Sequence, residues 1–202
     1  MSPASQDVSD PVIVACTPEA RGLMEPWMSI RYVVGNLLEA REDVIIHGVN
    51  ALGRFGAGVA AAMAATWPAA KDSYLAAHAA GRVKLGRVIW ADVGERMIGH
   101  AVTQPTIGRT GLHVSTEALT ACMAEVAAAS QTGIPGTRLT SGFRSIAMPR
   151  IGAGLGGGNW QQLETLIEEA IEGRQPDLDV AIYVLAPRDI PSWRGISNTR
   201  QI

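Results

Sequence analysis

The sequence predicts an α/β protein, a three-layer α/β/α sandwich around a mixed, mostly parallel sheet. Short apolar segments rich in β-branched residues alternate along the chain with alanine-rich or amphipathic segments of helical spacing. Two of the apolar segments lead into glycine loops that open helices. The chain has 202 residues, of which 47% are hydrophobic and 18% charged, as expected for one compact domain. We therefore expect a largely buried sheet covered by helices on both faces.

The expected elements follow in order. Strands are expected at residues 29–34, 44–46, 84–93, 96–103, 143–148 and 179–185. Helices are expected at residues 57–67, 68–80 and 116–129, with a fourth opening at Trp160. Pro68 separates the first two helices, because it disfavours helical geometry in the residue before it and suits the first turn of a helix.

The two ends of the chain differ from its middle. Residues 1–27 carry Pro, Ser and Asp around one short apolar patch, so we expect a poorly ordered or loosely docked N-terminal extension. A single domain should occupy residues 28–187, and residues 188–202 should form a polar C-terminal tail. The first residues lack a basic leader with a long apolar core, and no run of about 18 apolar residues occurs. We expect a cytoplasmic protein with no membrane partner.

Charge and cysteine content limit the classes of function. The formal net charge is −2, which gives no electrostatic argument for nucleic-acid binding. Cys16 and Cys122 lie far apart and belong to no Cys/His cluster, so we expect reduced cysteines and neither a zinc site nor another cofactor. A monomer is the expected state.

The most informative stretch is residues 44–60, which reads VIIHGVNALGRFGAGVA. His47 and Asn50 lie where the apolar strand should end, and three glycines punctuate the loop before the helix. In such a strand–loop–helix turn, backbone N–H groups face a phosphate and the helix dipole favours its charge. Neither a P-loop nor a G-x-G-x-x-G fingerprint is present. The alternative is a glycine-rich turn that serves only tight packing.

A second glycine loop occupies residues 149–159, PRIGAGLGGGN, and opens a helix at Trp160. Two such units in one domain could hold a diphosphate and its attached sugar from two sides. We expect this crevice at the carboxyl ends of the strands. Chance clustering is the alternative, because glycine accounts for 22 of the 202 residues.

HGVNALGRFGAGVA together with MPRIGAGLGGGNW resembles the two ligand loops of a macrodomain, the ADP-ribose-binding fold. The similarity runs from about Ile30 to Leu185 and includes YVVGNLL, WPAAKDSY, AVTQPTIGRTG and DVAIYVL. The branch that it resembles most comprises the yeast-type ADP-ribose 1″-phosphate phosphatases and the terminal ADP-ribose glycohydrolases.

This resemblance implies a set of ligand-binding residues. It places Asn50 at the distal ribose, and Asn36 where many macrodomains carry an aspartate that bonds the adenine amino group. Asn36 can accept the same hydrogen bond without a charge. Along the diphosphate, the resemblance places Gly56, Ala57, Gly58 and Val59 on one side and Gly152, Ala153, Gly154 and Leu155 on the other.

The same comparison gives the candidate chemistry. The glycohydrolase branch uses a lysine and an aspartate at the positions held here by Gln104 and Gly156, so a covalent sugar–lysine intermediate cannot form. The phosphatase type carries a histidine three residues before the ligand asparagine, which matches His47 and Asn50. His47 would activate water or protonate a leaving group. The alternative is a structural histidine that bonds the backbone at the strand end.

The favoured function is therefore hydrolysis of a substituent on the distal ribose of ADP-ribose, with ADP-ribose 1″-phosphate as substrate. The competing class is a non-catalytic reader or sequestering module for ADP-ribose-like nucleotides. A third possibility is a hydrolase of ester-linked ADP-ribose, in ADP-ribosylated protein or O-acetyl-ADP-ribose. The expected partner is ADP-ribose or a derivative, and an ADP-ribosylated protein under the third possibility.

Overall fold

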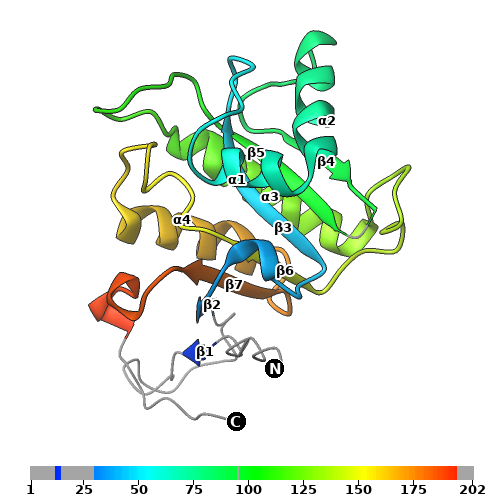
Figure 1. Ribbon diagram of the computed structural model, residues 1–202. Coiled ribbons are helices and arrows are strands. Elements are labelled where there is room, and N and C mark those ends of the chain that lie inside the picture. Colours follow the sequence, from blue (N-terminus) through cyan, green and yellow to red (C-terminus); the bar gives the residue numbers. More distant parts are fainter. Residues whose placement is uncertain (1–11, 15–29, 95, 195–202) are drawn as a thin grey trace, which may run out of the picture.

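The computed structural model describes residues 12–14, 30–94 and 96–194. Seven strands in these residues form one sheet in the order β1-β2-β7-β6-β3-β5-β4 (Figure 1). Their bounds are β1 (Val12–Val14), β2 (Ile30–Val34), β3 (Val44–Asn50), β4 (Val88–Asp92), β5 (Met97–Gln104), β6 (Ser145–Met148) and β7 (Asp179–Val184). The five strands from β2 to β5 in this order run parallel, and β1 and β4 pair antiparallel at the two edges. The predicted mixed, mostly parallel sheet is confirmed.

Helices cover both faces of the sheet, as the sequence predicted. They are α1 (Gly58–Thr66), α2 (Pro68–Ala79), α3 (Thr116–Thr132) and α4 (Trp160–Glu172), with short 3₁₀ turns η2 (Leu37–Glu39), η3 (Pro187–Asp189) and η4 (Ser192–Arg194). Successive side chains of β3 point to opposite faces. Ile45 and Val49 join the apolar core under α1 and α2, whereas Val44 and Ile46 join the core under α3 and α4. The result is an α/β/α sandwich.

Local sequence explains where the helices begin. The Ser115 hydroxyl accepts a hydrogen bond from Ala118 N (3.1 Å) and caps α3, and the Asn159 side chain accepts one from Gln162 N (3.2 Å) and caps α4. Pro68 lies in the first turn of α2, as expected. By contrast, α1 begins after Ala57 and has no side-chain cap. The start of α1 therefore keeps its backbone N–H groups available.

Short segments near both ends of the chain contact the domain. Within the N-terminal extension, expected to be poorly ordered or loosely docked, Val12–Val14 form β1, which pairs with β2 so that Val12 lies opposite Val34. The rest of residues 1–27 lies outside the described residues, as do residues 195–202. In the tail, η4 docks onto α4: Trp193 Nε1 and Arg194 Nε donate to the buried carboxylate of Glu164 at 3.0 Å each. None of the helices in the described part of the chain has the length and apolar character to cross a membrane.

Candidate functional site

The loops that follow the parallel strands gather at one edge of the sheet, because the carboxyl ends of parallel strands meet there (Figure 1). We call residues 51–58 the first glycine loop, residues 105–115 the β5–α3 loop and residues 149–159 the second glycine loop. A methyl group built at Gly58 would lie 3.7 Å from Leu155 Cδ1, so the two glycine loops face each other. His113 N and Val114 N donate to Gly156 O at 2.8 and 3.1 Å. These contacts join the three loops into one continuous surface at the edge where the sequence predicts the ligand crevice, and we call this loop surface the crevice.

Asn50 braces the first glycine loop from the end of β3. Its Oδ1 accepts hydrogen bonds from Leu52 N (2.9 Å) and Arg54 N (3.2 Å), and its Nδ2 donates to Arg54 O (2.6 Å). The side chain is buried, with one Nδ2 hydrogen left for a ligand. The predicted contact between Asn50 and the distal ribose stays a prediction, and the structure adds a second task for the same amide.

The start of α1 offers a row of free backbone donors. Residues 56–58 are exposed and Val59 is half-buried. Among the described residues, the N–H groups of residues 56–59 have no hydrogen-bond acceptor. The positive end of the helix dipole lies at the same place, which favours an anion. The four positions predicted on this side of the diphosphate are therefore suited to that contact.

The second glycine loop satisfies some of its own backbone groups. Gly158 N donates to Gly152 O (2.9 Å), Gly157 N to Gly154 O (3.0 Å) and Ala153 N to Arg150 O (3.2 Å). The N–H groups of Gly154 and Leu155 have no acceptor among the described residues. Of the predicted set, Gly154 and Leu155 can therefore offer donors to an anion, whereas Ala153 N–H is already bonded. Gly152 N–H also has no acceptor among the described residues, but Gly152 is buried.

Gly156 lies where the loop turns back on itself. A methyl group built on Gly156 would come within 2.4 Å of Gly152 O and 2.8 Å of Gly152 Cα. No side chain fits there unless the backbone moves. The position compared above with a catalytic aspartate therefore has no room for a carboxylate.

Gln104 lies beside Asn50 at the end of β5. The register between β3 and β5 shifts after Val49, so that Thr103 is the extra residue and Asn50 pairs with Gln104. Ala51 N donates to Gln104 O at 2.8 Å. The paired residues at these two strand ends are therefore both neutral carboxamides, and neither is a lysine.

His47 lies inside the protein and not at the mouth of the crevice. Its side chain has 0% exposure, and its Nε2 shares a hydrogen bond of 2.6 Å with His100 Nδ1. Burial, followed by the neighbouring His100, lowers the pKa of His47 well below its usual value. The catalytic role of His47 stays a prediction, but from this position the ring cannot touch a ligand in the crevice. The hydrogen bond of the His47 ring goes to His100, and not to the backbone as the structural alternative expected.

His47 belongs to an aromatic cluster that supports the first glycine loop. We call His47, Phe55, Tyr74 and His100 the aromatic cluster. The Phe55 ring lies 5.7 Å from His47, 5.5 Å from His100 and 5.2 Å from Tyr74, measured between ring centroids. The sequence assigned no role to His100, because nothing in it shows that β3 and β5 are neighbours with His47 opposite His100.

Asn36 lies just after β2, where Gly35 N donates to Val184 O (2.9 Å). Its exposed side chain caps η2: Oδ1 accepts from Leu38 N (3.1 Å) and Nδ2 donates to Glu39 Oε1 (2.9 Å). One lone pair of Oδ1 is left for the predicted adenine contact.

The loops around the crevice are basic although the chain carries a net negative charge. Arg54, Arg109 and Arg150 lie in the three loops, whose sequences contain no Asp or Glu. None of these arginines forms a salt bridge with another described residue. In the β5–α3 loop, His113 bonds Thr106 Oγ1 and Thr110 O at 2.9 Å each, an organising role that the sequence did not indicate. The crevice edge is thus suited to an anionic ligand.

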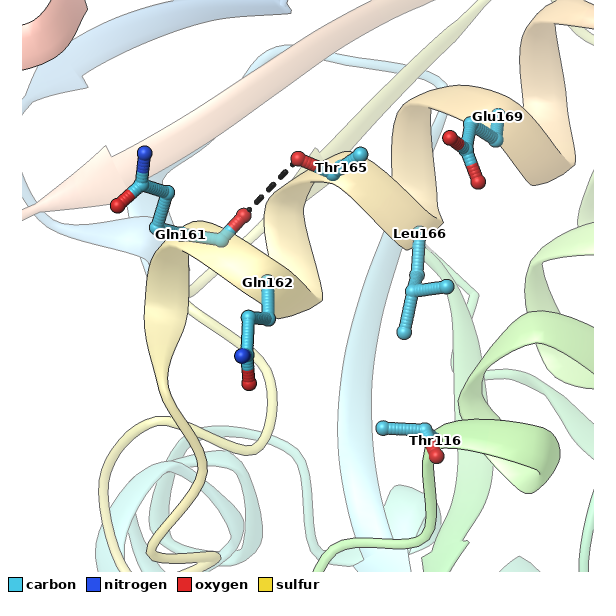
Figure 2. Close-up of a pocket in the computed structure, with 6 residues that line it drawn as sticks. All are labelled: Thr116, Gln161, Gln162, Thr165, Leu166 and Glu169. Carbon is cyan, nitrogen blue, oxygen red and sulfur yellow. Dashed lines mark hydrogen bonds between the residues drawn. The ribbon is translucent and has the colours of Figure 1, made fainter.

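A hollow lies on the outer surface of α4 beside the first turn of α3 (Figure 2). Its lining is Thr116, Gln161, Gln162, Thr165, Leu166 and Glu169. Five of these six side chains are exposed, and none is a buried polar group without a partner. In the part of the chain that the structure describes, no group of three or more His, Cys, Asp or Glu side chains could hold a metal ion. The glycine-loop crevice is therefore the better candidate site.

These features define a three-layer α/β/α domain with two glycine loops facing each other at the carboxyl edge of its sheet. The chain belongs to the macrodomain family: the sequence model of the Macro domain matches residues 46–167. This establishes the family resemblance noted from the two loops.

Similar proteins include two whose names state an activity or a complex. A "DNA ADP-ribosyl glycohydrolase" of Thermus aquaticus is 29% identical over 168 residues, which cover 83% of this chain and 44% of that protein. The chain thus spans less than half the length of this curated relative. The macrodomain of Thermus aquaticus DarG is 30% identical with a TM-score of 0.62, and the match covers 76% of this chain and 96% of that one. Thermosipho africanus DarTG in complex with ADP-ribose shares the fold at 17% identity, with a TM-score of 0.65 over 82% of this chain and 44% of that one.

Proposed function

We propose that this chain binds ADP-ribose in the crevice between its two glycine loops. The observation that carries the proposal is the row of N–H groups at residues 56–59, which have no acceptor in the described part of the chain and lie at the uncapped start of α1. Gly154 and Leu155 supply further free N–H groups from the facing loop. A diphosphate needs such a set of fixed donors and benefits from the helix dipole.

The remaining parts of the ligand follow from this placement. The distal ribose would lie at the carboxamides of Asn50 and Gln104, which are neighbours at the ends of β3 and β5. The adenine would lie near Asn36, with the free lone pair of Oδ1 facing its amino group. Arg54 and Arg109 would add favourable long-range attraction for the two phosphates.

The arrangement supports binding more strongly than turnover. General acid–base catalysis needs a titratable group within hydrogen-bond reach of the reacting atoms. His47 is enclosed in the core, Gln104 is neutral, and Gly156 has neither a side chain nor room for one. We therefore propose a non-catalytic ADP-ribose reader as the primary function, and place the ADP-ribose 1″-phosphate phosphatase activity second because it depends on His47.

Calorimetry with ADP-ribose tests the proposal, using wild type, Gly58→Ala and Gly58→Glu. Gly58 has φ +55°, so any side chain there carries the same backbone strain, and alanine measures that cost. Glutamate adds a carboxylate beside the diphosphate, and repulsion at short range should weaken binding at least about tenfold relative to alanine. Equal affinities of the two variants, or no binding by folded wild type, would contradict the proposal.

A second candidate function is hydrolysis of a group attached to the distal ribose. It is favoured by the 29% identity to a protein named DNA ADP-ribosyl glycohydrolase. Because Gln104 cannot act as a nucleophile, water would have to attack the distal ribose or its substituent directly. The candidate substrates are ADP-ribose 1″-phosphate, ester-linked ADP-ribose and DNA-linked ADP-ribose.

Single-turnover assays with each of these substrates separate the enzyme from the reader. If the protein is an enzyme that uses His47, His47→Ala should slow release by about 10²-fold while ADP-ribose affinity changes less than about tenfold. Equal release by wild type and His47→Ala would show that His47 is structural. Binding without release from any substrate would establish the reader.

A further inference from the structure

We propose that Tyr74 of α2 is a positioning residue that holds the first glycine loop in the shape needed for its ligand. The inference rests on the proposed ADP-ribose site, but Tyr74 itself lies beneath the loop and not in the crevice. It acts through two groups of the loop, the end of β3 at Asn50 and the turn at Gly53.

The hydroxyl group of Tyr74 ties these two groups together. It donates to Asn50 O at 2.7 Å and accepts a hydrogen bond from Gly53 N at 3.1 Å. Asn50 in turn holds Leu52 N and Arg54 N through its side-chain oxygen. The turn from Asn50 to Arg54 is therefore closed on one side by the Asn50 amide and on the other by a single hydroxyl from another element.

The ring of Tyr74 supports the next part of the loop. It is fully buried, and its centroid lies 5.2 Å from that of Phe55, the residue immediately before Gly56. Phe55 also contacts His47 and His100, so the aromatic cluster forms the floor on which the loop rests. The position of Phe55 against the other three rings therefore fixes where the N–H groups of residues 56–59 begin.

Close packing between the loop and α2 leaves little freedom for another arrangement. Gly53 has φ +71°, and a methyl group built on it would meet the His78 ring of α2 at 2.8 Å. Burial raises the pKa of Tyr74, so its hydroxyl remains a donor at neutral pH. Loss of that hydroxyl would leave both Asn50 O and Gly53 N without this partner in a tightly packed turn, and the turn would have to relax.

The test compares Tyr74→Phe with Tyr183→Phe. Both variants lose one hydroxyl group and keep the ring. The Tyr183 hydroxyl donates to Glu42 Oε2 at 3.1 Å and, among the described residues, forms no hydrogen bond with either glycine loop. Two quantities are measured for each protein: the Kd for ADP-ribose by calorimetry, and amide hydrogen exchange at Gly53 and Arg54 without ligand. Circular dichroism verifies that both variants are folded.

We expect Tyr74→Phe to raise the Kd about tenfold or more and to accelerate exchange at Gly53 by a similar factor. Tyr183→Phe should change each quantity less than about twofold. A Tyr74→Phe protein with wild-type Kd and exchange would overturn the inference, as would an equal loss of affinity in Tyr183→Phe. Failure of wild type itself to bind ADP-ribose would instead overturn the proposed function.

Discussion

The hydrogen-bonded pair of His47 and His100 is the clearest case of a residue whose surroundings decide its role. Both rings are fully buried, and one hydrogen bond of 2.6 Å joins His47 Nε2 to His100 Nδ1, with one nitrogen as donor and the other as acceptor. His47 Nδ1 has no hydrogen-bond partner among the described residues. Neutral imidazoles pack well in such a site, whereas an imidazolium would be costly. The pair therefore stabilises the fold only in its neutral form.

This pair predicts a loss of stability in mild acid. Burial lowers the pKa of His100 to about 4 and that of His47 well below its usual value, so the unfolded chain binds more protons at pH 5. Stability should be highest above pH ~6.5 and fall by about 2 kcal/mol or more between pH 7 and pH 5. Urea unfolding at a series of pH values measures the free energy of unfolding. A variant with both histidines replaced by leucine should lose much less, and an equal loss would contradict the account.

Two glycines of the second glycine loop should respond differently to replacement by alanine. A methyl group at Gly156 would meet Gly152 O at 2.4 Å, whereas one at Gly154 would find no atom within 4 Å. Gly156→Ala should therefore distort the second glycine loop and weaken ADP-ribose binding about tenfold or more, while Gly154→Ala should stay within about threefold. Titration calorimetry compares them, and similar affinities would mean that the second glycine loop does not shape the site.

Among the elements, the regular ones were predictable and the edge strand was not. The apolar run at Val44 and the amphipathic spacing after Trp160 predicted β3 and α4, because each element buries its own apolar face. β1 has only three residues, and its pairing with β2 depends on contacts across 20 residues of chain. A segment that short carries no periodicity to predict it.

The candidate site shows the same division. Strand-end positions such as Asn50 and the exposed glycines of the loops follow from local sequence, because loops after parallel strands meet at one edge. The residues that support these loops from below do not follow from local sequence. Tyr74 lies in the WPAAKDSY segment, but its bonds to Asn50 and Gly53 depend on how α2 packs against the sheet. His100 faces His47 only through the register of β5 with β3.

Removal of the edge strand gives a prediction at the element scale. A chain that starts at Met28 lacks β1 and leaves the outer edge of β2 unpaired. We expect it to fold with a melting temperature lower by about 4 °C, equivalent to about 1 to 2 kcal/mol in a chain of this size. ADP-ribose affinity should change less than about threefold, because the loops of the crevice remain. Thermal denaturation of the full chain and of the shortened chain measures this difference. Identical melting temperatures would show that β1 adds no stability.

On the scale of the whole molecule, charge and shape point to one end of the sheet. The chain has a net charge of −2, yet the three loops of the crevice carry Arg54, Arg109 and Arg150 and no carboxylate. The free N–H groups of both glycine loops lie at the same edge. The hollow beside α4 in Figure 2 has no arginine in its lining, and its one charged side chain is Glu169. One surface of the molecule is thus suited to an anionic nucleotide.

The most direct test of this account is a titration of the ¹⁵N-labelled protein with ADP-ribose, followed by the chemical shifts of its backbone amides. The account predicts the largest changes at residues 56–59 and 154–156, with smaller ones at Gly35 and Asn36. Amides of the α4 hollow, such as Thr165 and Leu166, should stay near their starting positions. Changes concentrated at the α4 hollow, or no changes at millimolar ADP-ribose, would contradict the claim that the two glycine loops bind this ligand.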